Sequence, residues 1–223
     1  MALIELESVV KTYTMGKNSF DALKGVSLSI EKGEFVAFMG ESGSGKSSIM
    51  NIIGCLDRPS SGIHRFDGIE ANTLDDDQMA YVRSRRIGFI YQNFNLLPQF
   101  TALENAAMPL LYTDVPASDR KKRATEALTM VGLAKWSHHK PTELSGGQQQ
   151  RVAIARALVK DPIIIFGDEL TGNVDEKTGV EIMTICRNLN DRGVTIVIVT
   201  HSNEVAEWAD RIIFVKDGKL GGA

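Results

Sequence analysis

The stretch "GESGSGKS" at residues 40–47 decides how this chain is expected to fold. It matches the pattern G-x-x-x-x-G-K-[ST] and stands between an apolar run, "EFVAFM", and a segment with the apolar pattern of a helix. Small residues allow backbone N–H groups to converge on phosphate oxygens at the positive end of a helix. A plain glycine-rich turn is the alternative interpretation, and the strand–loop–helix context favours a phosphate-binding loop.

Two side chains of this loop have specific expected roles. Lys46 can reach the β- and γ-phosphates of a nucleoside triphosphate, and the hydroxyl of Ser47 can ligate Mg²⁺. The residues predicted to contact the nucleotide here are Gly40, Glu41, Ser42, Gly43, Ser44, Gly45, Lys46, Ser47 and Ser48.

Outward from the loop, the apolar pattern predicts an α/β fold. Residues 4–13 and 23–30 alternate apolar and polar positions, as half-buried strands do. The near-continuous runs "PIIIF" and "VTIVIV" are typical of strands buried on both faces, and hence of a parallel sheet flanked by helices.

Strand signals nearly vanish between residues 93 and 160. Three helices are predicted there, over "TALENAAMPLLY", "SDRKKRATEALTMVGL" and "SGGQQQRVAIARALVK". We therefore expect one domain over residues 1–223. It comprises a nucleotide-binding core (1–92 and 161–223) interrupted by a helical subdomain (93–160).

A pair of acidic residues follows a buried strand. Asp168 comes after "IIIFG", where an unpartnered carboxylate is costly, and is expected to hold Mg²⁺ directly or through a water. Glu169 stands where the strand should end, placed to polarise an attacking water as a general base. The alternative, an exposed acidic turn, is disfavoured by the apolar run before it.

Two further polar residues are expected at strand ends. His201 follows "VTIVIVT", at the carboxyl edge where α/β sheets bind ligands, and is predicted to contact the γ-phosphate or to orient Glu169 and the water. A satisfied structural histidine is the alternative. Gln92 ends "RIGFIYQ" at the border of the helical segment, where it could touch Mg²⁺ or the water.

Composition excludes several other classes of protein. The 223 residues carry a net charge of −3, which gives no support to a nucleic-acid partner. Cys55 and Cys186 are far apart and form no metal-binding motif, so two buried free thiols are expected. We see no signal-peptide pattern at the N-terminus, and the apolar runs are too short to cross a bilayer.

The stretch "LSGGQQQR" at residues 144–151 contains a second glycine pair. Ser145, Gly146 and Gly147 stand at the start of a predicted helix, which makes a second anion-binding site. The first loop of the chain already surrounds the phosphates, so this second site lacks an obvious ligand in its own chain.

Taken together, these segments resemble an ABC-type ATPase. "GESGSGKSS", "YQ" at Gln92, "LSGGQQQR", "IIIFGDE" and "VTH" look like its Walker A, Q-loop, signature, Walker B and H-loop elements, in that order over essentially the whole chain. "DALKGVSLSIEKGEFVAFMG", "FNLLPQFTALENA" and "TGNVDEKTG" resemble more narrowly the branch of macrolide-exporter and lipoprotein-release ATPases.

The resemblance implies an ATPase that uses ATP and Mg²⁺ and pairs head to tail as a homodimer. Each signature would close on the γ-phosphate held by the partner's Walker A loop. A bulky side chain at Gly147 is then predicted to spare ATP binding to the monomer but to abolish closure and turnover. The implied signature residues are Leu144, Ser145, Gly146, Gly147 and Gln148; the implied catalytic residues are Lys46, Gln92, Glu169 and His201; the implied metal ligands are Ser47, Gln92 and Asp168; Tyr13 would stack on adenine, and Asp175 would be the D-loop aspartate.

The same resemblance implies an integral membrane permease subunit as partner, a cytoplasmic location on the inner face of the membrane, and in some members an extracytoplasmic adaptor. The docking surface is expected near residues 94–107. A soluble ABC machine acting on DNA or ribosomes would need coiled-coil insertions, tandem cassettes or basic arms, which the sequence lacks. A nucleotide-binding regulator without hydrolysis is disfavoured because Glu169 and His201 are retained.

Four positions depart from the family pattern. Glu41 and Leu170 stand where proline is usual, Ser48 where threonine is commoner, and Gly167 where alanine is common. None of these changes removes a catalytic group, although the leucine is expected to loosen the turn after the acidic pair.

Overall fold

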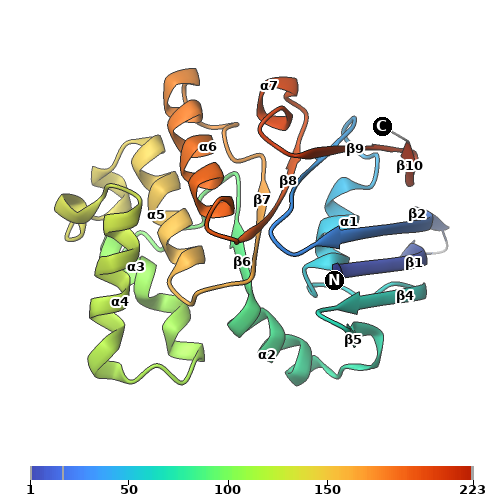
Figure 1. Ribbon diagram of the computed structural model, residues 1–223, viewed down its shortest axis with the longest axis horizontal. Coiled ribbons are helices and arrows are strands. Elements are labelled where there is room, and N and C mark those ends of the chain that lie inside the picture. Colours follow the sequence, from blue (N-terminus) through green and yellow to red (C-terminus); the bar gives the residue numbers. More distant parts are fainter. Residues whose placement is uncertain (1, 17, 222–223) are drawn as a thin grey trace.

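The computed structural model describes residues 2–16 and 18–221 of the chain (Figure 1). Its centre is a six-stranded sheet in the order β10-β9-β3-β8-β7-β6. Strands β9, β3, β8, β7 and β6 run parallel, whereas the edge strand β10 is antiparallel to β9. The bounds are β3 (Phe35–Met39), β6 (Ile87–Ile90), β7 (Ile164–Asp168), β8 (Thr195–Thr200), β9 (Arg211–Lys216) and β10 (Lys219–Gly221).

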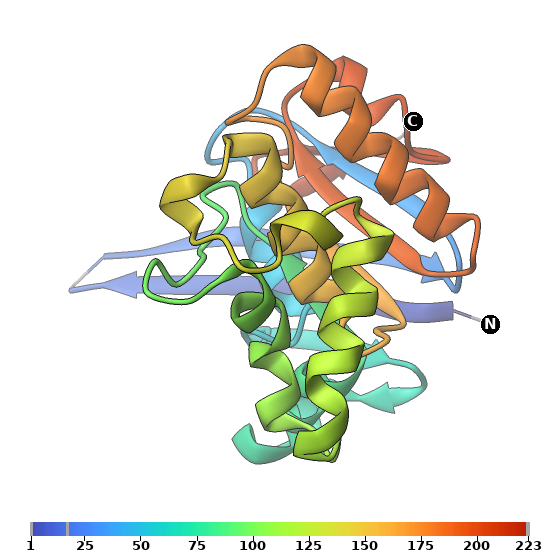
Figure 2. The ribbon, with the colours of Figure 1, turned by 90° about the vertical axis from the view of Figure 1, so that its left-hand side faces the viewer.

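A second, antiparallel sheet has the order β2-β1-β4-β5. The first two strands form a long hairpin that projects beyond the rest of the molecule (Figure 2), and four register shifts along it add twist. These bulges explain why the alternation in the sequence indicates shorter strands than are formed. The bounds are β1 (Ala2–Met15), β2 (Asn18–Glu31), β4 (Ser61–Phe66) and β5 (Ile69–Glu70).

The α-helices fall into two groups: α3, α4 and α5 lie between β6 and β7 in the sequence, and α1, α2, α6 and α7 lie between other strands. Residues 93–160, all of which the structure describes, form helices and loops without a strand. The bounds are α1 (Lys46–Ile53), α2 (Asp76–Arg86), α3 (Ala102–Ala107), α4 (Ala117–Met130), α5 (Gly146–Leu158), α6 (Glu176–Asn190) and α7 (Asn203–Ala206). Each described helix is too short or too polar to span a bilayer.

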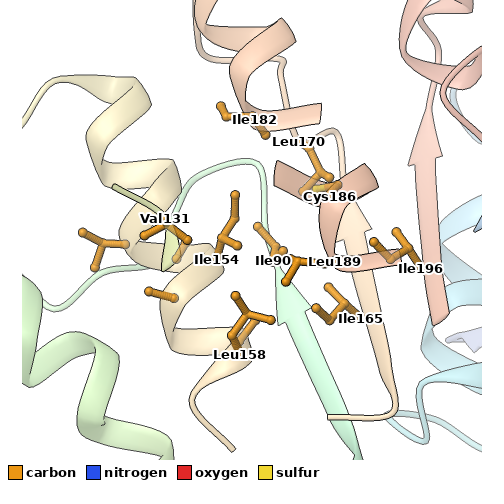
Figure 3. Packing of buried hydrophobic residues seen from close by; sticks show 14 of the residues in the cluster. Ile90, Val131, Ile154, Leu158, Ile165, Leu170, Ile182, Cys186, Leu189 and Ile196 are labelled. Atoms are coloured by element: carbon orange, nitrogen blue, oxygen red, sulfur yellow. The ribbon is translucent and has the colours of Figure 1, made fainter. Parts of the chain in front are cut away.

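One hydrophobic core joins the helical segment to the central sheet. Ile154 and Leu158 of α5 lie between Val131, at the end of α4, and the strand residues Ile90 and Ile165 (Figure 3). The same cluster continues to α6 on this face of the sheet. A second cluster, on the other face, packs α1 and the antiparallel sheet against the central strands. Because α5 packs on the central strands, a displacement of α5 is expected to shift those strands.

The element boundaries differ from the expected ones where proline intervenes or a strand ends early. The predicted helix "TALENAAMPLLY" is α-helical only to Ala107 and continues as a 3₁₀ helix over Met108–Tyr112, because Pro109 has no N–H to donate. The predicted strand up to Gln92 ends at Ile90, so Gln92 lies in the loop beyond it. Cys55 and Cys186 are free and buried, as predicted.

Candidate active site

The expected polar residues meet at one edge of the central sheet. In the parallel register Met39 pairs with Thr200, and Val199 pairs with Asp168. The glycine loop, the acidic pair and His201 therefore leave adjacent strands at the same carboxyl edge, which is where ligands bind in sheets of this kind.

The loop after β3 needs glycine at two positions. Gly45 has φ +111°, and a Cβ there would lie 2.7 Å from the carbonyl oxygen of Ala22 in β2. A Cβ on Gly40 would lie 2.2 Å from the carbonyl oxygen of Val215 in β9. The N-terminal hairpin and the C-terminal strand thus press directly on this loop, and only residues without a side chain allow that approach.

Lys46 and the first turn of α1 have the features of a phosphate site. The ammonium group donates to the carbonyl oxygens of Gly40 and Glu41, at 2.7 Å each, so the charge is held inside the loop. Helix α1 has no side-chain cap and no acidic residue in its first turn, which leaves its first N–H groups free for an anion. The buried Ser44 hydroxyl has no hydrogen-bond partner among the described residues.

A cavity of about 680 Å³ lies over this loop. Among the described residues, Gly40, Glu41 and Ser44 belong to the same loop but do not line the cavity. The predicted residues that do line it are Tyr13, Ser42, Gly43, Gly45, Lys46, Ser47, Ser48, Gln92, Asp168, Glu169 and His201.

The acidic pair fits a divalent cation. Burial and the neighbouring Glu169 carboxylate raise the pKa of Asp168, and Lys46 offsets part of this effect. The two carboxylates repel each other when both are ionised, and a bound cation would relieve that repulsion. No group of three or more His, Cys, Asp or Glu residues converges within the described chain. That pattern suits Mg²⁺, which is commonly bound through one or two carboxylates together with substrate phosphates.

Glu169 is held by three contacts. Its N–H donates to the carbonyl of Val199 (2.9 Å), and its carboxylate accepts from the Thr200 hydroxyl (3.2 Å). His201 Nδ1 lies 2.7 Å from Glu169 Oε1. Of the two roles expected for His201, this contact favours orientation of Glu169. The φ of Glu169 is +47°, an uncommon left-handed conformation for a side-chain-bearing residue.

Gln92 lies against the turn that follows Glu169. Its side-chain nitrogen is so close to Gly172 that a Cβ there would meet it at 2.8 Å. The backbone carbonyl of Gln92 accepts a hydrogen bond from the side-chain NH₂ of Asn173 (2.8 Å). The loop after β6 and the turn after β7 are therefore in direct contact at the cavity.

Tyr13 is half-buried at the mouth of the cavity. Its hydroxyl donates to Asp57 Oδ2 (3.1 Å), while Lys11 lies 5.0 Å from the ring centroid and also pairs with Asp57. Phe20, opposite on β2, has its ring centroid 5.8 Å away. These contacts fix the tyrosine ring as one wall of the cavity.

Sequence reasoning missed several cavity residues. Phe20, Lys24, Asp217 and Gly218 line it, although they lie on the hairpin and on the β9–β10 turn, far from the motifs. Gly218 N–H donates to the carbonyl of Ser44 (2.9 Å), which ties that turn to the loop. The "DG" pair indicates a turn, but no local pattern places it beside the loop.

The signature residues lie elsewhere. Ser145 is exposed and caps α5, forming a reciprocal capping box with Gln148. Within the described chain, none of the residues 144–148 lines the cavity. A Cβ on Gly147 would lie 2.2 Å from the Thr178 Cγ2 of the same chain, so the prediction that a bulky group there acts on closure alone must be revised.

Asp175 caps the neighbouring helix α6. It accepts hydrogen bonds from the hydroxyl (2.7 Å) and the backbone N–H (3.0 Å) of Thr178, and these bonds lower the pKa of its carboxyl. The structure thus gives Asp175 a capping function within the chain, next to the signature helix.

The family model described as "ABC transporter" matches residues 23–172. An uncharacterized ABC transporter ATP-binding protein of Thermotoga maritima is 49% identical over 220 residues, 99% of this chain and 94% of that protein. The chain belongs to the ABC transporter family. It is an ATP-binding and ATP-hydrolysing cassette of a transporter, similar to the branch that contains the macrolide exporters.

Two further relatives define how far the similarity extends. The macrolide export ATP-binding/permease protein MacB of Syntrophobacter fumaroxidans is 51% identical over 99% of this cassette, which covers 31% of that longer protein. The solved dimer of the ATP-binding cassette MJ0796 of Methanocaldococcus jannaschii, in a post-hydrolysis state with ADP and Pi, is 49% identical. Its TM-score is 0.90, with 98% of this chain and 97% of that one covered.

Gly167 and Leu170, two of the positions noted above as departures, are in direct contact in this cassette. A Cβ on Gly167 would lie 2.7 to 2.8 Å from three side-chain carbons of Leu170, which is 3% exposed. The leucine thus fills the space that an alanine methyl would take. The Leu170 side chain packs directly on the strand, a contact that argues against the expected loosening of this turn.

Proposed function

We propose that two copies of this cassette close around ATP, and that hydrolysis reopens them to drive a membrane permease subunit. The observation that carries this proposal is the separation of the two anion-binding sites. The cavity has the Walker A loop and the acidic pair. Ser145 at the start of α5 is exposed outside that cavity, so a phosphate that binds there would come from another chain. A head-to-tail pair gives each cavity a signature from the other copy. The dimeric MJ0796 relative supports this arrangement.

The proposed chemistry is in-line attack of water on the γ-phosphate. Lys46 and the N–H groups of α1 bind the phosphates, and Glu169, oriented by His201, takes the proton of the attacking water. Ser47, Gln92 and Asp168 would hold Mg²⁺, which neutralises charge on the phosphates. Tyr13 would stack on adenine, and the turn of Asp175 would lie at the dimer interface.

The proposed docking surface is an apolar groove of about 560 Å³ between α2, the end of α1 and the 3₁₀ helix after α3. Tyr81 (62% exposed), Tyr112 (72% exposed) and Phe89 line it. Phe89 also stacks on Phe166 of β7, at 5.4 Å, so the groove touches the strand that carries Asp168. Among the described residues, none of the segment 94–107 expected from sequence lines this groove; Pro109 and Tyr112, which follow that segment in the chain, do.

The occupant we propose is an amphipathic segment of the permease. Relatives such as MacB are described as ATP-binding/permease proteins, in which the two functions share one chain. By analogy, this cassette would work on the cytoplasmic face of the membrane, and an extracytoplasmic adaptor would complete some assemblies. The helical subdomain, residues 93–160, would transmit the stroke.

Cell fractionation tests the membrane partner. The unaltered chain and a Tyr81→Asp/Tyr112→Asp variant are compared with Ile69→Asp, which adds a charge at a site of similar exposure (52%) on the other sheet. The groove variant is expected in the soluble fraction, with ATPase activity retained, while the control stays with membranes. Equal membrane association of all three would contradict the proposed groove.

A further inference from the structure

Gln150 is a buried amide that connects the signature helix to the catalytic turn. It lies on α5, five positions after Ser145, and is 0% exposed. Its side-chain NH₂ donates to the carbonyl of Leu170 at 2.9 Å, with both groups buried. Its side-chain oxygen has no partner among the described residues, so the bond to Leu170 is the one hydrogen bond that this side chain makes with them.

The carbonyl that Gln150 binds belongs to the residue directly after Glu169. On the other side, Glu169 is tied by its N–H to Val199, and its own carbonyl accepts from Gly172 N–H at 3.0 Å. Leu170 is pinned over Gly167 by its side chain. Gln150 is thus the contact by which α5, rather than the sheet, holds the left-handed backbone of Glu169.

We infer that Gln150 is a positioning residue: it makes the signature end of α5 and the Glu169 turn of the same chain move as one unit. This inference rests on the proposed dimer. There, the signature of one chain touches the nucleotide of one site, while Glu169 of that chain serves the other site. Closure at one signature is passed through Gln150 to the general base of the second site, so the two sites are coupled.

The chain offers a matched control one position earlier. The Gln149 side chain donates to the Leu144 carbonyl (3.1 Å), inside the signature segment itself and away from Leu170. Gln149→Met and Gln150→Met remove the same chemical group from neighbouring positions of α5. Methionine approximates the volume of glutamine and also removes the unpaired oxygen of Gln150, so the core is expected to tolerate it.

The experiment measures ATPase kinetics of the unaltered chain and both variants, with kcat expressed per ATP-binding chain counted by titration. Gln150→Met is expected to lower kcat on the order of tenfold or more through misplacement of Glu169, with KM for ATP unchanged. Gln149→Met acts inside the signature segment, so any loss of kcat in that variant is expected to go with an equal loss of the ATP-dependent dimer. In a Glu169→Gln background, Gln150→Met should still form the ATP-dependent dimer, because the signature contacts are intact.

The outcomes separate this inference from the function on which it rests. Failure of the Glu169→Gln chain to dimerise at saturating ATP and Mg²⁺ would overturn the proposed dimer and this coupling together. Normal kcat for Gln150→Met, in a chain that dimerises and hydrolyses ATP, would overturn the role of Gln150 alone, as would a loss of dimer equal to the loss of kcat. Gln150→Leu, which also lacks the donor, replaces methionine if the first variant folds poorly.

Discussion

The close contact between Gly147 and Thr178 makes a quantitative prediction about packing beneath the signature. An alanine at position 147 would place its Cβ 2.2 Å from Thr178 Cγ2, whereas the next nearest atoms, Thr178 Cβ and Oγ1, would be at 3.4 and 3.5 Å. One methyl group therefore causes the conflict. Thr178 cannot rotate away freely, because its hydroxyl is bonded to Asp175.

Gly147→Ala is expected to lower the free energy of unfolding by about 1–3 kcal/mol, the usual cost of overpacking. Thr178→Ser removes the conflicting methyl and keeps the hydroxyl that bonds to Asp175. Alone it should cost less than about 0.8 kcal/mol, the value of one fully buried methylene. In the double variant, most of the alanine penalty should disappear.

Urea unfolding of the unaltered chain, both single variants and the double variant measures this coupling. The predicted interaction energy is about 1–2 kcal/mol, with the double variant more stable than the sum of the single changes implies. Additive effects within about 0.5 kcal/mol would refute the proposed steric origin. The result also matters for function, because Gly147 variants test the dimer cleanly only when Thr178 is changed as well.

Three other predictions follow from the site and the core. Gly167→Ala should destabilise the chain by about 1–3 kcal/mol and lower kcat, and Leu170→Ala should relieve part of both effects; equal losses with either residue at 170 would count against the pairing. Burial lowers the pKa of His64 from 6.5 to about 4, so the unfolded chain binds a proton first as pH falls. Stability should therefore be fully present above about pH 6.5 and fall by about 3 kcal/mol towards pH 4, a slope that His64→Gln should flatten in urea titrations. Tyr13→Ala should weaken ATP binding about tenfold or more in a fluorescence titration, and an unchanged affinity would exclude stacking on this ring.

The motifs predicted the chemistry of the site because each is a strand end or helix start readable from local sequence. Lys46 and Asp168 follow apolar runs that could only be buried strands, and parallel strands bring their carboxyl ends to one edge. The register that pairs Val199 with Asp168 then places Glu169 beside His201. The spacing of these two residues in the sequence does not by itself predict that contact.

The remaining features depend on contacts between distant segments. The approach of Ala22 to Gly45 and of Gly147 to Thr178 involves backbone or methyl groups, for which no residue type is diagnostic. Likewise Gln150 is one of three adjacent glutamines, and only its hydrogen bond to Leu170, just after β7, separates its role from that of its neighbours. Leu170 departs from the family pattern in sequence, and only the structure shows that its side chain packs against the backbone of Gly167.

The state of association of the Glu169→Gln variant decides whether two copies of the cassette share each ATP site. Without its general base the cassette should bind ATP and stop before hydrolysis, so the closed pair accumulates. Light scattering after size exclusion is predicted to give twice the mass of one chain with saturating ATP and Mg²⁺, and the mass of one chain with ADP. A chain that remains single at saturating ATP would contradict the account of two sites shared between two copies.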